Sequence, residues 1–191
     1  MKLKPLLFAF ALLVSTSSLF AQEFAVDKGA TFISGVASFT SQGGELFEDY
    51  DGNNASTFNL SPSVNYFVGK NFFIGGGLEF AHEKQGDYKS NNIGLGPQIG
   101  YAFGNEKSTA FPYFDIGLRY YGMSVDYGSG NSEGSGTDIF LGAGIVVPVK
   151  SHLGITFEAG YHMMDINEKE SDTSYSGNIF AIGIGIVGLL F

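Results

Sequence analysis

Four charged side chains are the strongest candidates for a functional cluster in this sequence: Glu79, Asp115, Arg119 and Glu158. Arg119 is the only basic residue among them. Burying three carboxylates with one guanidinium is costly unless the groups pair, share protons or hold water. Two interpretations stay open: an ion-pair plug that closes an interior and fixes strand register, or a gate in which Arg119 changes carboxylate partners and lets small solutes pass.

The chain contains three histidines that could act as metal ligands or general bases: His82, His152 and His162. In the strands predicted below, His82 and His152 lie at opposite ends, and His162 lies ten residues along from His152. An enzyme would need a nucleophile and an acid beside a histidine. Near His162 the available candidates are Ser174, Ser176 and Asp165. This combination is unspecific, so we expect no enzyme, no metal site and no catalytic residue.

Three glycines near the C-terminus, Gly183, Gly185 and Gly188, match the spacing of the dinucleotide-binding fingerprint G-x-G-x-x-G. That fingerprint needs a following helix and an acidic residue about 20 positions further on. Only three residues follow Gly188. We therefore expect close-packing positions in a strand, and no cofactor.

The composition excludes several classes of protein. There are 19 acidic and 10 basic residues, which gives a net charge of -9 and argues against a nucleic-acid partner, since phosphate binding needs a basic surface. The absence of cysteine excludes disulfides, thiolate metal sites and a lipoprotein anchor. Charged residues make up only 15% of the chain, against roughly 25% in a soluble domain. Little charge is available to cover a water-exposed surface.

Residues 1–21 have the layout of a secretory signal peptide. A basic start at Lys2 and Lys4 precedes an apolar run, residues 6–14, and a polar stretch. The apolar run is shorter than the about 20 residues of a membrane-spanning helix. We expect cleavage at the end of this stretch and one exported domain, residues 22–191.

From about residue 29 the chain alternates apolar residues with small or polar ones, which is typical of β-strands. In the second to seventh of these alternating segments, one face carries no charged residue. The opposite face carries every charge, including the four candidate residues. The pattern predicts eight strands, near residues 29–39, 57–68, 72–82, 91–103, 111–124, 138–149, 152–164 and 178–191.

This alternation favours a membrane barrel over a soluble β-sandwich. A sandwich shows solvent a face rich in Lys, Glu and Thr, whereas the polar face here is mostly Gly, Asn and Ser. Small side chains suit a narrow barrel interior, and an uncharged face suits hydrocarbon. Aromatic residues are predicted to form a belt at each membrane interface: Tyr66, Phe72, Tyr101 and Phe111 at one, and Phe39, Phe58, Phe80, Tyr120 and Tyr161 at the other.

The predicted connections alternate in length. Long links, 40–56, 83–90, 125–137 and 165–177, follow the odd-numbered strands, and short links, 69–71, 104–110 and 150–151, follow the even-numbered ones. Short turns on one side and long loops on the other are typical of an outer-membrane barrel with both termini in the periplasm. We expect an all-β, eight-stranded, antiparallel up-and-down barrel, which leaves no strand edge in lipid.

The C-terminal segment ends in Phe191, with Leu189 and Val187 at the second and fourth positions before it. It looks like the signal that the outer-membrane assembly machinery reads in β-barrel proteins. The mature chain resembles the small OmpA/OmpX-like outer-membrane β-barrel family of Gram-negative bacteria, often called porin-family proteins. The resemblance implies a protein that this machinery inserts and that outer-membrane lipids and lipopolysaccharide surround.

The last strand departs from that family's pattern. If Phe191 faces lipid, the even-numbered apolar residues face inward: Phe180, Ile182, Ile184, Ile186 and Leu190. Two explanations stay open. These side chains could fill part of the interior as in any packed core, or they could line a partly apolar cavity for a lipid-like ligand.

Two predicted loops carry a concentration of acidic residues: Glu45, Glu48, Asp49 and Asp51 in the first, and Asp165, Glu168, Glu170 and Asp172 in the last. Solvated acidic loops are the default interpretation. A weak site for divalent cations that bridge to lipopolysaccharide is the alternative, although the spacing does not fit an EF-hand.

We therefore expect a monomeric outer-membrane protein with a structural or surface-interaction role and a plugged lumen. A narrow pore or a route for hydrophobic molecules through the barrel is the alternative, and an enzyme acting on outer-membrane lipid is a third class. The sequence does not identify an extracellular ligand.

Overall fold

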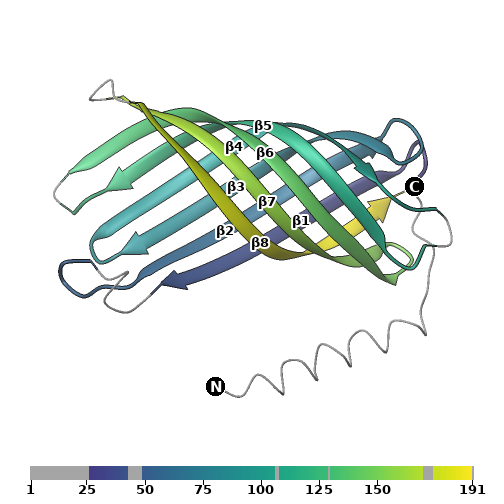
Figure 1. Cartoon of the computed structure of the whole chain (residues 1–191), viewed down its shortest axis with the longest axis horizontal. Coiled ribbons are helices and arrows are strands. Elements are labelled where there is room, and N and C mark those ends of the chain that lie inside the picture. The colour runs from purple at the N-terminus through teal and green to yellow at the C-terminus, as the bar shows by residue number, and fades with distance from the viewer. Residues whose placement is uncertain (1–25, 43–48, 106–107, 129, 170–173, 191) are drawn as a thin grey trace, which may run out of the picture.

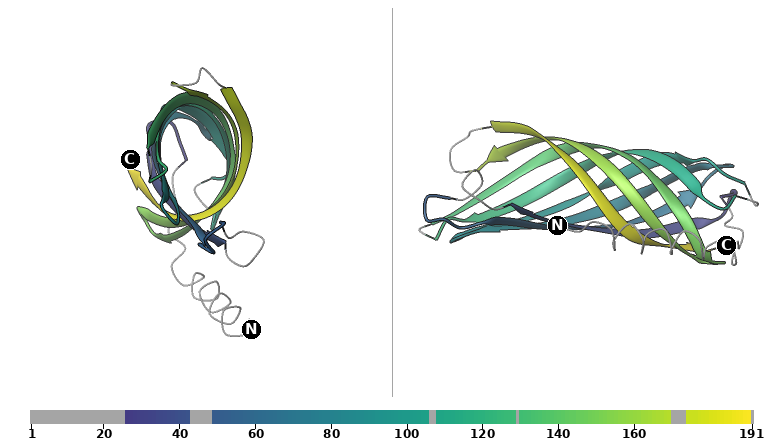
Figure 2. Two further views of the ribbon diagram at one scale, coloured as in Figure 1. Left: turned by 90° about the vertical axis from the view of Figure 1, so that its left-hand side faces the viewer. Right: turned by 60° about the horizontal axis from the view of Figure 1, so that its bottom comes forward.

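The computed structural model describes residues 26–42, 49–105, 108–128, 130–169 and 174–190. Eight strands pair in chain order into one antiparallel barrel, which β8 closes by pairing with β1 (Figure 1 and Figure 2). This confirms the predicted eight-stranded up-and-down all-β barrel. No helix within the described residues is long and apolar enough to cross a membrane. The strands are β1 (Thr31–Gln42), β2 (Ala55–Phe67), β3 (Phe72–Gln85), β4 (Tyr88–Ala102), β5 (Phe111–Asp126), β6 (Asn131–Lys150), β7 (Leu153–Glu168) and β8 (Ser174–Leu190).

The two faces of the barrel wall differ as the alternation in β2–β7 predicted. Apolar side chains such as Val64, Ile116 and Leu118 point outward and are about half exposed, whereas Asn65 and Gln98 are buried inside. Since successive residues of a strand point to opposite faces, the orientation of one residue determines which face every other residue of that strand occupies. The outer face is thus a continuous uncharged surface suited to hydrocarbon.

The inward orientation considered for the even-numbered residues of β8, which assumed that Phe191 faces lipid, is not the one that the structure shows. Val187 and Leu189 are completely buried inside the barrel, and the even-numbered apolar residues point outward, with Ile182 70% exposed. Gly185 is compatible with this orientation, whereas a Cβ atom there would lie 2.3 Å from the backbone oxygen of Gly35 in β1. The apolar cavity and the apolar interior packing proposed for this strand both depended on the inward orientation. Phe191 lies outside the described residues.

The aromatic belts match the prediction with one exception. Phe39, Phe58, Phe80, Tyr120 and Tyr161 are all outward-facing and exposed at one end. At the other end Tyr66 and Phe72 are also exposed, and Tyr101 and Phe114 stack with ring centroids 6.2 Å apart. Phe111 was assigned to this belt, but its side chain is buried inside the barrel.

The predicted alternation of link lengths is also wrong. The link between β3 and β4 consists of Gly86 and Asp87 alone, and the links after β5 and β7 are residues 127–130 and 169–173. A turn of two residues favours φ > 0, which Gly86 adopts at 58°. Beyond the outward-facing apolar residues, the strands continue as hydrogen-bonded hairpins of polar residues. Strand lengths predicted from apolar alternation are therefore too short.

The barrel has two distinct ends. Thr31 and Leu190 are opposite each other in the β1–β8 pairing, at what we call the terminus end. The hairpin of β3 and β4 turns at the opposite end, the loop end (Figure 1). The predicted signal peptide, residues 1–21, lies outside the described residues.

Buried apolar side chains close the terminus end. Phe67 and Phe73 meet edge to face with centroids 5.6 Å apart, and Phe32 lies 6.3 Å from Phe73. The segment before β1 contributes, because the backbone N–H of Asn71 donates to the backbone carbonyl of Val26 (2.9 Å). The space left among these side chains is about 10 Å³, at the lower limit for one water molecule. We call this group the terminus-end cluster: Val26, Ala30, Phe32, Phe67, Phe73, Ala102, Phe111, Tyr113, Val146, Val187 and Leu189.

The seam between β1 and β8 is paired along only part of its length. β1 pairs with β2 from Thr31 to Gln42, but with β8 only from Thr31 to Ala37, opposite Leu190 to Ile184. Within the described residues, β1 from Ser38 and β8 before Ile184 have no partner across this seam. Figure 1 shows the two strands diverging towards the loop end. The wall is therefore complete at the terminus end and open along one seam at the loop end.

Paired cysteines should report where the seam is closed. In Ile33→Cys/Gly188→Cys the two positions are register partners on the outer face, and we expect a disulfide to form readily on oxidation. In Phe39→Cys/Ile182→Cys the two positions lie two steps beyond the last pair, and we expect little disulfide. The chain has no other cysteine, so non-reducing gel mobility measures each pair directly. Equal disulfide yields in the two variants would contradict an open seam.

Candidate functional site

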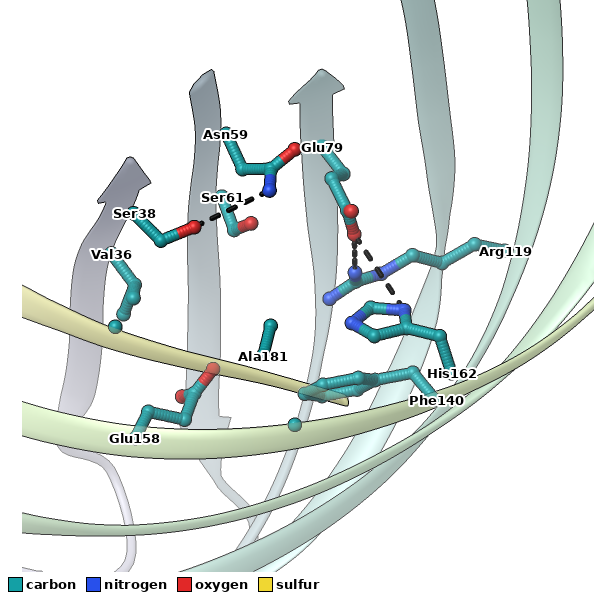
Figure 3. Close-up of a pocket in the computed structure, with 12 residues that line it drawn as sticks. Val36, Ser38, Asn59, Ser61, Glu79, Arg119, Phe140, Glu158, His162 and Ala181 are labelled. Carbon is teal, nitrogen blue, oxygen red and sulfur yellow. Dashed lines mark hydrogen bonds and ion pairs between the residues drawn. The ribbon is translucent and has the colours of Figure 1, made fainter. Parts of the chain in front are cut away.

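The centre of the barrel interior is occupied by an ion pair between β3 and β5. Glu79 and Arg119 both point inward and form a salt bridge (Figure 3). Arg119 is only 4% exposed, and its guanidinium lies 4.4 Å from the ring centroid of Phe140 in β6. The carboxylate and the aromatic face together compensate for burying the charge.

His162 of β7 and Asp138 of β6 extend this group. The His162 Nδ1 atom lies 2.9 Å from Asp138 Oδ2 and 4.0 Å from Glu79 Oε2. The imidazole ring also packs on Phe140 with centroids 4.9 Å apart. We call these five residues the central cluster: Glu79, Arg119, Asp138, Phe140 and His162.

The other two predicted residues, Asp115 and Glu158, lie nearer the terminus end. The Tyr113 hydroxyl donates to Glu158 Oε2 (2.5 Å), and Thr156 Oγ1 lies 3.1 Å from the same hydroxyl. Asp115 is buried with its Oδ1 atom accepting no hydrogen bond from the described residues. Arg119 interacts electrostatically with both carboxylates. The four predicted residues are thus electrostatically connected, but only Glu79 and Arg119 are in direct contact.

Sequence reasoning missed Asp138 and His162 as members of the cluster. Both lie on the polar face of the predicted strands, which indicates that they point inward. Whether they pair with each other depends on how β6 and β7 are staggered. Phe140 faces His162 across the β6–β7 pairing, and this places Asp138 within reach of the imidazole. Alternation within one strand carries no information about that stagger.

The catalytic arrangement considered around His162 is not assembled. Asp165 is exposed and is the register partner of Ser176, whereas His162 is buried inside the barrel. Ser174 hydrogen-bonds to Asn167 (2.5 Å), further towards the loop end. His162 is instead held by Asp138, with no serine hydroxyl among the described contacts of its ring.

Glycines make room for the buried polar side chains. A Cβ atom on Gly94 would lie 2.5 Å from the ring of Tyr121, and one on Gly142 would lie 2.0 Å from Asp115 Oδ1. The interior of an eight-stranded barrel is only wide enough for its own side chains. The glycines of the polar face are therefore required for the large residues beside them.

Two spaces lie along the barrel axis above the terminus-end cluster. A small one of about 40 Å³ adjoins the central cluster and is lined also by Val36, Ser61 and Glu158. A larger one of about 420 Å³ lies between the central cluster and the loop end, and we call it the vestibule. Asn59 donates to Ser38 Oγ (3.3 Å) where the two spaces meet (Figure 3). The interior thus narrows from an open vestibule to a closed terminus end.

Polar contacts order the described parts of the loop end. Asp49 Oδ1 accepts from the backbone amides of Asp51 (3.0 Å) and Asn53 (2.8 Å), and the hydrogen bonds from Asn53 lower the pKa of the Asp49 carboxyl. The Asp49 carboxylate therefore serves the turn itself. Lys169 donates to Glu133 Oε2 (2.8 Å), which lowers the pKa of Glu133. The loop residues Glu45, Glu48, Glu170 and Asp172 lie outside the described residues.

The sequence from residue 6 to residue 186 matches the model of a family described as "Outer membrane protein beta-barrel domain". The chain belongs to this family. Its members' shared location places the protein in the outer membrane, in keeping with the uncharged outer wall. A search of curated proteins finds no match.

Solved structures of small outer-membrane barrels have the same fold as this family member. Neisserial surface protein A is 17% identical with a TM-score of 0.54, and the alignment covers 84% of this chain and 97% of that one. OprG from Pseudomonas aeruginosa is 12% identical with a TM-score of 0.57 and coverages of 87% and 98%. The N-terminal β-barrel domain of Pseudomonas aeruginosa OprF is 12% identical, with a TM-score of 0.54 and coverages of 86% and 98%. At these identities the likeness extends to the fold alone.

Breaking the central ion pair should destabilise the barrel. Arg119→Met leaves the buried Glu79 carboxylate without its partner, and we expect a loss of about 3–5 kcal/mol in the free energy of unfolding. Glu79→Gln/Arg119→Met removes both charges and should recover most of that loss. Urea unfolding in lipid vesicles, followed by the gel shift between folded and unfolded barrel, measures the difference.

Lys169→Met is the matched control, because it breaks an exposed ion pair at the loop end. We expect no measurable change in the unfolding midpoint. A loss in Arg119→Met no larger than that in Lys169→Met would contradict the role of the central pair.

Proposed function

We propose that this protein is a structural or surface-interaction component of the outer membrane, with a lumen that does not conduct. The observation that carries this proposal is the double closure of the interior. The central cluster fills the middle with paired charges, and the terminus-end cluster leaves a space of only about 10 Å³. A solute would have to displace both an ion-pair network and a packed aromatic cluster.

The arrangement of the paired charges supports a plug rather than a gate. Arg119 is held by Glu79 on one side and by the face of Phe140 on another, and His162 pairs with the Asp138 carboxylate. For Arg119 to change partners, the ring of Phe140 would have to move within a closely packed barrel. The cluster therefore fixes the relative positions of β3, β5, β6 and β7.

In this proposal the terminus end faces the periplasm and the loop end faces the outside. The polar hairpins, with the turn of Asp49 and the pair of Glu133 and Lys169, then form the surface that meets external partners. The barrel is a monomer surrounded by outer-membrane lipids and lipopolysaccharide, and it is inserted by the outer-membrane assembly machinery. In this proposal it has no enzymatic activity, which agrees with the lack of a serine hydroxyl among the described contacts of the His162 ring.

The residues of the predicted assembly signal do not all face lipid. The signal was placed on Val187, Leu189 and Phe191, and the first two are buried inside the barrel. The outward residues Ile184, Ile186 and Leu190 form the apolar outer face of the same strand. Recognition of the last strand from its lipid side therefore depends on these even-numbered residues.

Planar-bilayer recordings test the closed lumen. We expect the refolded protein to give no stepwise conductance, and Arg119→Ala to give none either, because the terminus-end cluster still closes the barrel. Lys169→Ala controls for effects of removing a basic residue. Discrete conductance steps in the native protein that change in Arg119→Ala, but not in Lys169→Ala, would contradict the plug and support a gate.

A further inference from the structure

The open part of the β1–β8 seam lies at the depth of the membrane. Phe39, on the β1 edge, belongs to the aromatic belt of the loop end, and Phe180 and Ile182 lie on the facing β8 edge. They are among the most exposed apolar residues of the barrel wall, at 68%, 66% and 70%. Ile182 is two positions deeper in the wall than Phe180. The deepest part of the opening, at Phe39 and Ile182, thus lies between the membrane interface and the hydrocarbon region.

The vestibule reaches the lipid side through this opening. Its lining includes Ser38 on the β1 edge and four consecutive residues of β8, Ile179 to Ile182. Successive strand residues point to opposite faces, so a cavity lined by all four extends around the β8 edge. Elsewhere in the barrel neighbouring strands pair along nearly their whole length, with short interruptions at Pro62, Pro97 and Pro148, and separate the interior from lipid.

An opening at this depth requires an occupant with two kinds of surface. Unpaired backbone groups in hydrocarbon cost several kcal/mol each, so the strand edges need polar partners. The vestibule offers hydroxyl and amide groups at Ser38, Thr57 and Asn59, whereas Met164 and Ile179 give it an apolar side next to the seam. A molecule with a polar head beside the strand edges, near Ser38 and Asn59, and a hydrocarbon tail along Met164 and Ile179 matches both surfaces.

The charges of the vestibule favour a positive head. Glu79 and Glu83 both line it. The single arginine of the sequence, Arg119, is already paired with Glu79. Among the described residues no ion pair involves Glu83. An anionic head would meet the Glu83 carboxylate, and no lysine or arginine is among the described residues that line the vestibule. A cationic head would be attracted by Glu83.

The size of the vestibule suits one hydrocarbon chain. Its volume of about 420 Å³ is near the lower end of the range of small-molecule sites, roughly 300–1,000 Å³. The two chains of a phospholipid would not fit beside a head group. We infer that the vestibule binds a single-chain amphiphile with a positively charged head, which enters from the outer leaflet through the open β1–β8 seam.

Tryptophan quenching can test this site, because the chain has no tryptophan of its own. Met164→Trp places a reporter inside the vestibule, and Leu118→Trp places one on the lipid-facing wall of β5. The probes are dodecyltrimethylammonium and dodecyl sulfate with brominated chains, added to the protein in phosphatidylcholine nanodiscs. Ile166→Trp, a second vestibule position, serves if Met164→Trp does not fold.

We expect saturable quenching of the vestibule reporter by the ammonium probe, at a half-saturating concentration at least about fivefold below that of the sulfate probe. The wall reporter should be quenched in proportion to the probe in the bilayer, without saturation. Quenching of both reporters without saturation would mean membrane partition only and would overturn the site. Equal or stronger binding of the sulfate probe would overturn the positive head.

The contribution of the carboxylate is tested by Glu83→Gln in the Met164→Trp background. We expect the half-saturating concentration of the ammonium probe to rise by about fivefold, with no rise for the sulfate probe. Glu133→Gln is the matched control, since it removes the same charge from an exposed position outside the vestibule. An equal shift in the two variants would show general surface attraction and overturn the role of Glu83. Conductance remains the test of the closed lumen, so the two proposals can fail separately.

Discussion

Backbone hydrogen bonding in hydrocarbon is the constraint on which the rest of this structure depends. Water is absent there, so unpaired strand edges are costly, and eight strands reduce this cost by closing into a ring through the pairing of β1 with β8. Eight strands also fix a narrow interior. The glycines of the inner face, the pairing of Arg119 with Glu79 and the stacking on Phe140 all follow from fitting charged side chains into that space.

Alternation predicted the barrel and the faces of β2–β7 because each of those strands has one uncharged and one polar face. It failed for β8, where Ile182 and Val187 are apolar on opposite faces and hydropathy cannot decide between them. In the structure, Gly185 lies close to the backbone of β1, and Val187 and Leu189 pack in the terminus-end cluster. The contact of Gly185 with β1 exists only after closure. The strand ends were also underestimated, since polar hairpins continue the backbone ladder without an apolar signal.

The candidate site was predictable as a set of inward residues but not as a set of contacts. Glu79 and Arg119 were expected together and do meet, while Asp115 and Glu158 lie nearer the terminus end around Tyr113. Contacts inside a barrel depend on the stagger between strands, which is a property of the whole ring. The pairing of His162 with Asp138 is of this kind.

The short β1–β8 pairing also affects how the chain folds. These two strands are the most distant in sequence, so joining them costs more loop-closure entropy than forming any hairpin between neighbours. The backbone pairing of residues Thr31 to Ala37 with β8, together with the apolar contacts of Val187 and Leu189, must offset that entropy cost. Ring closure is therefore the expected slow step of assembly, and mutations in this stretch should change the folding rate more than mutations in the hairpins.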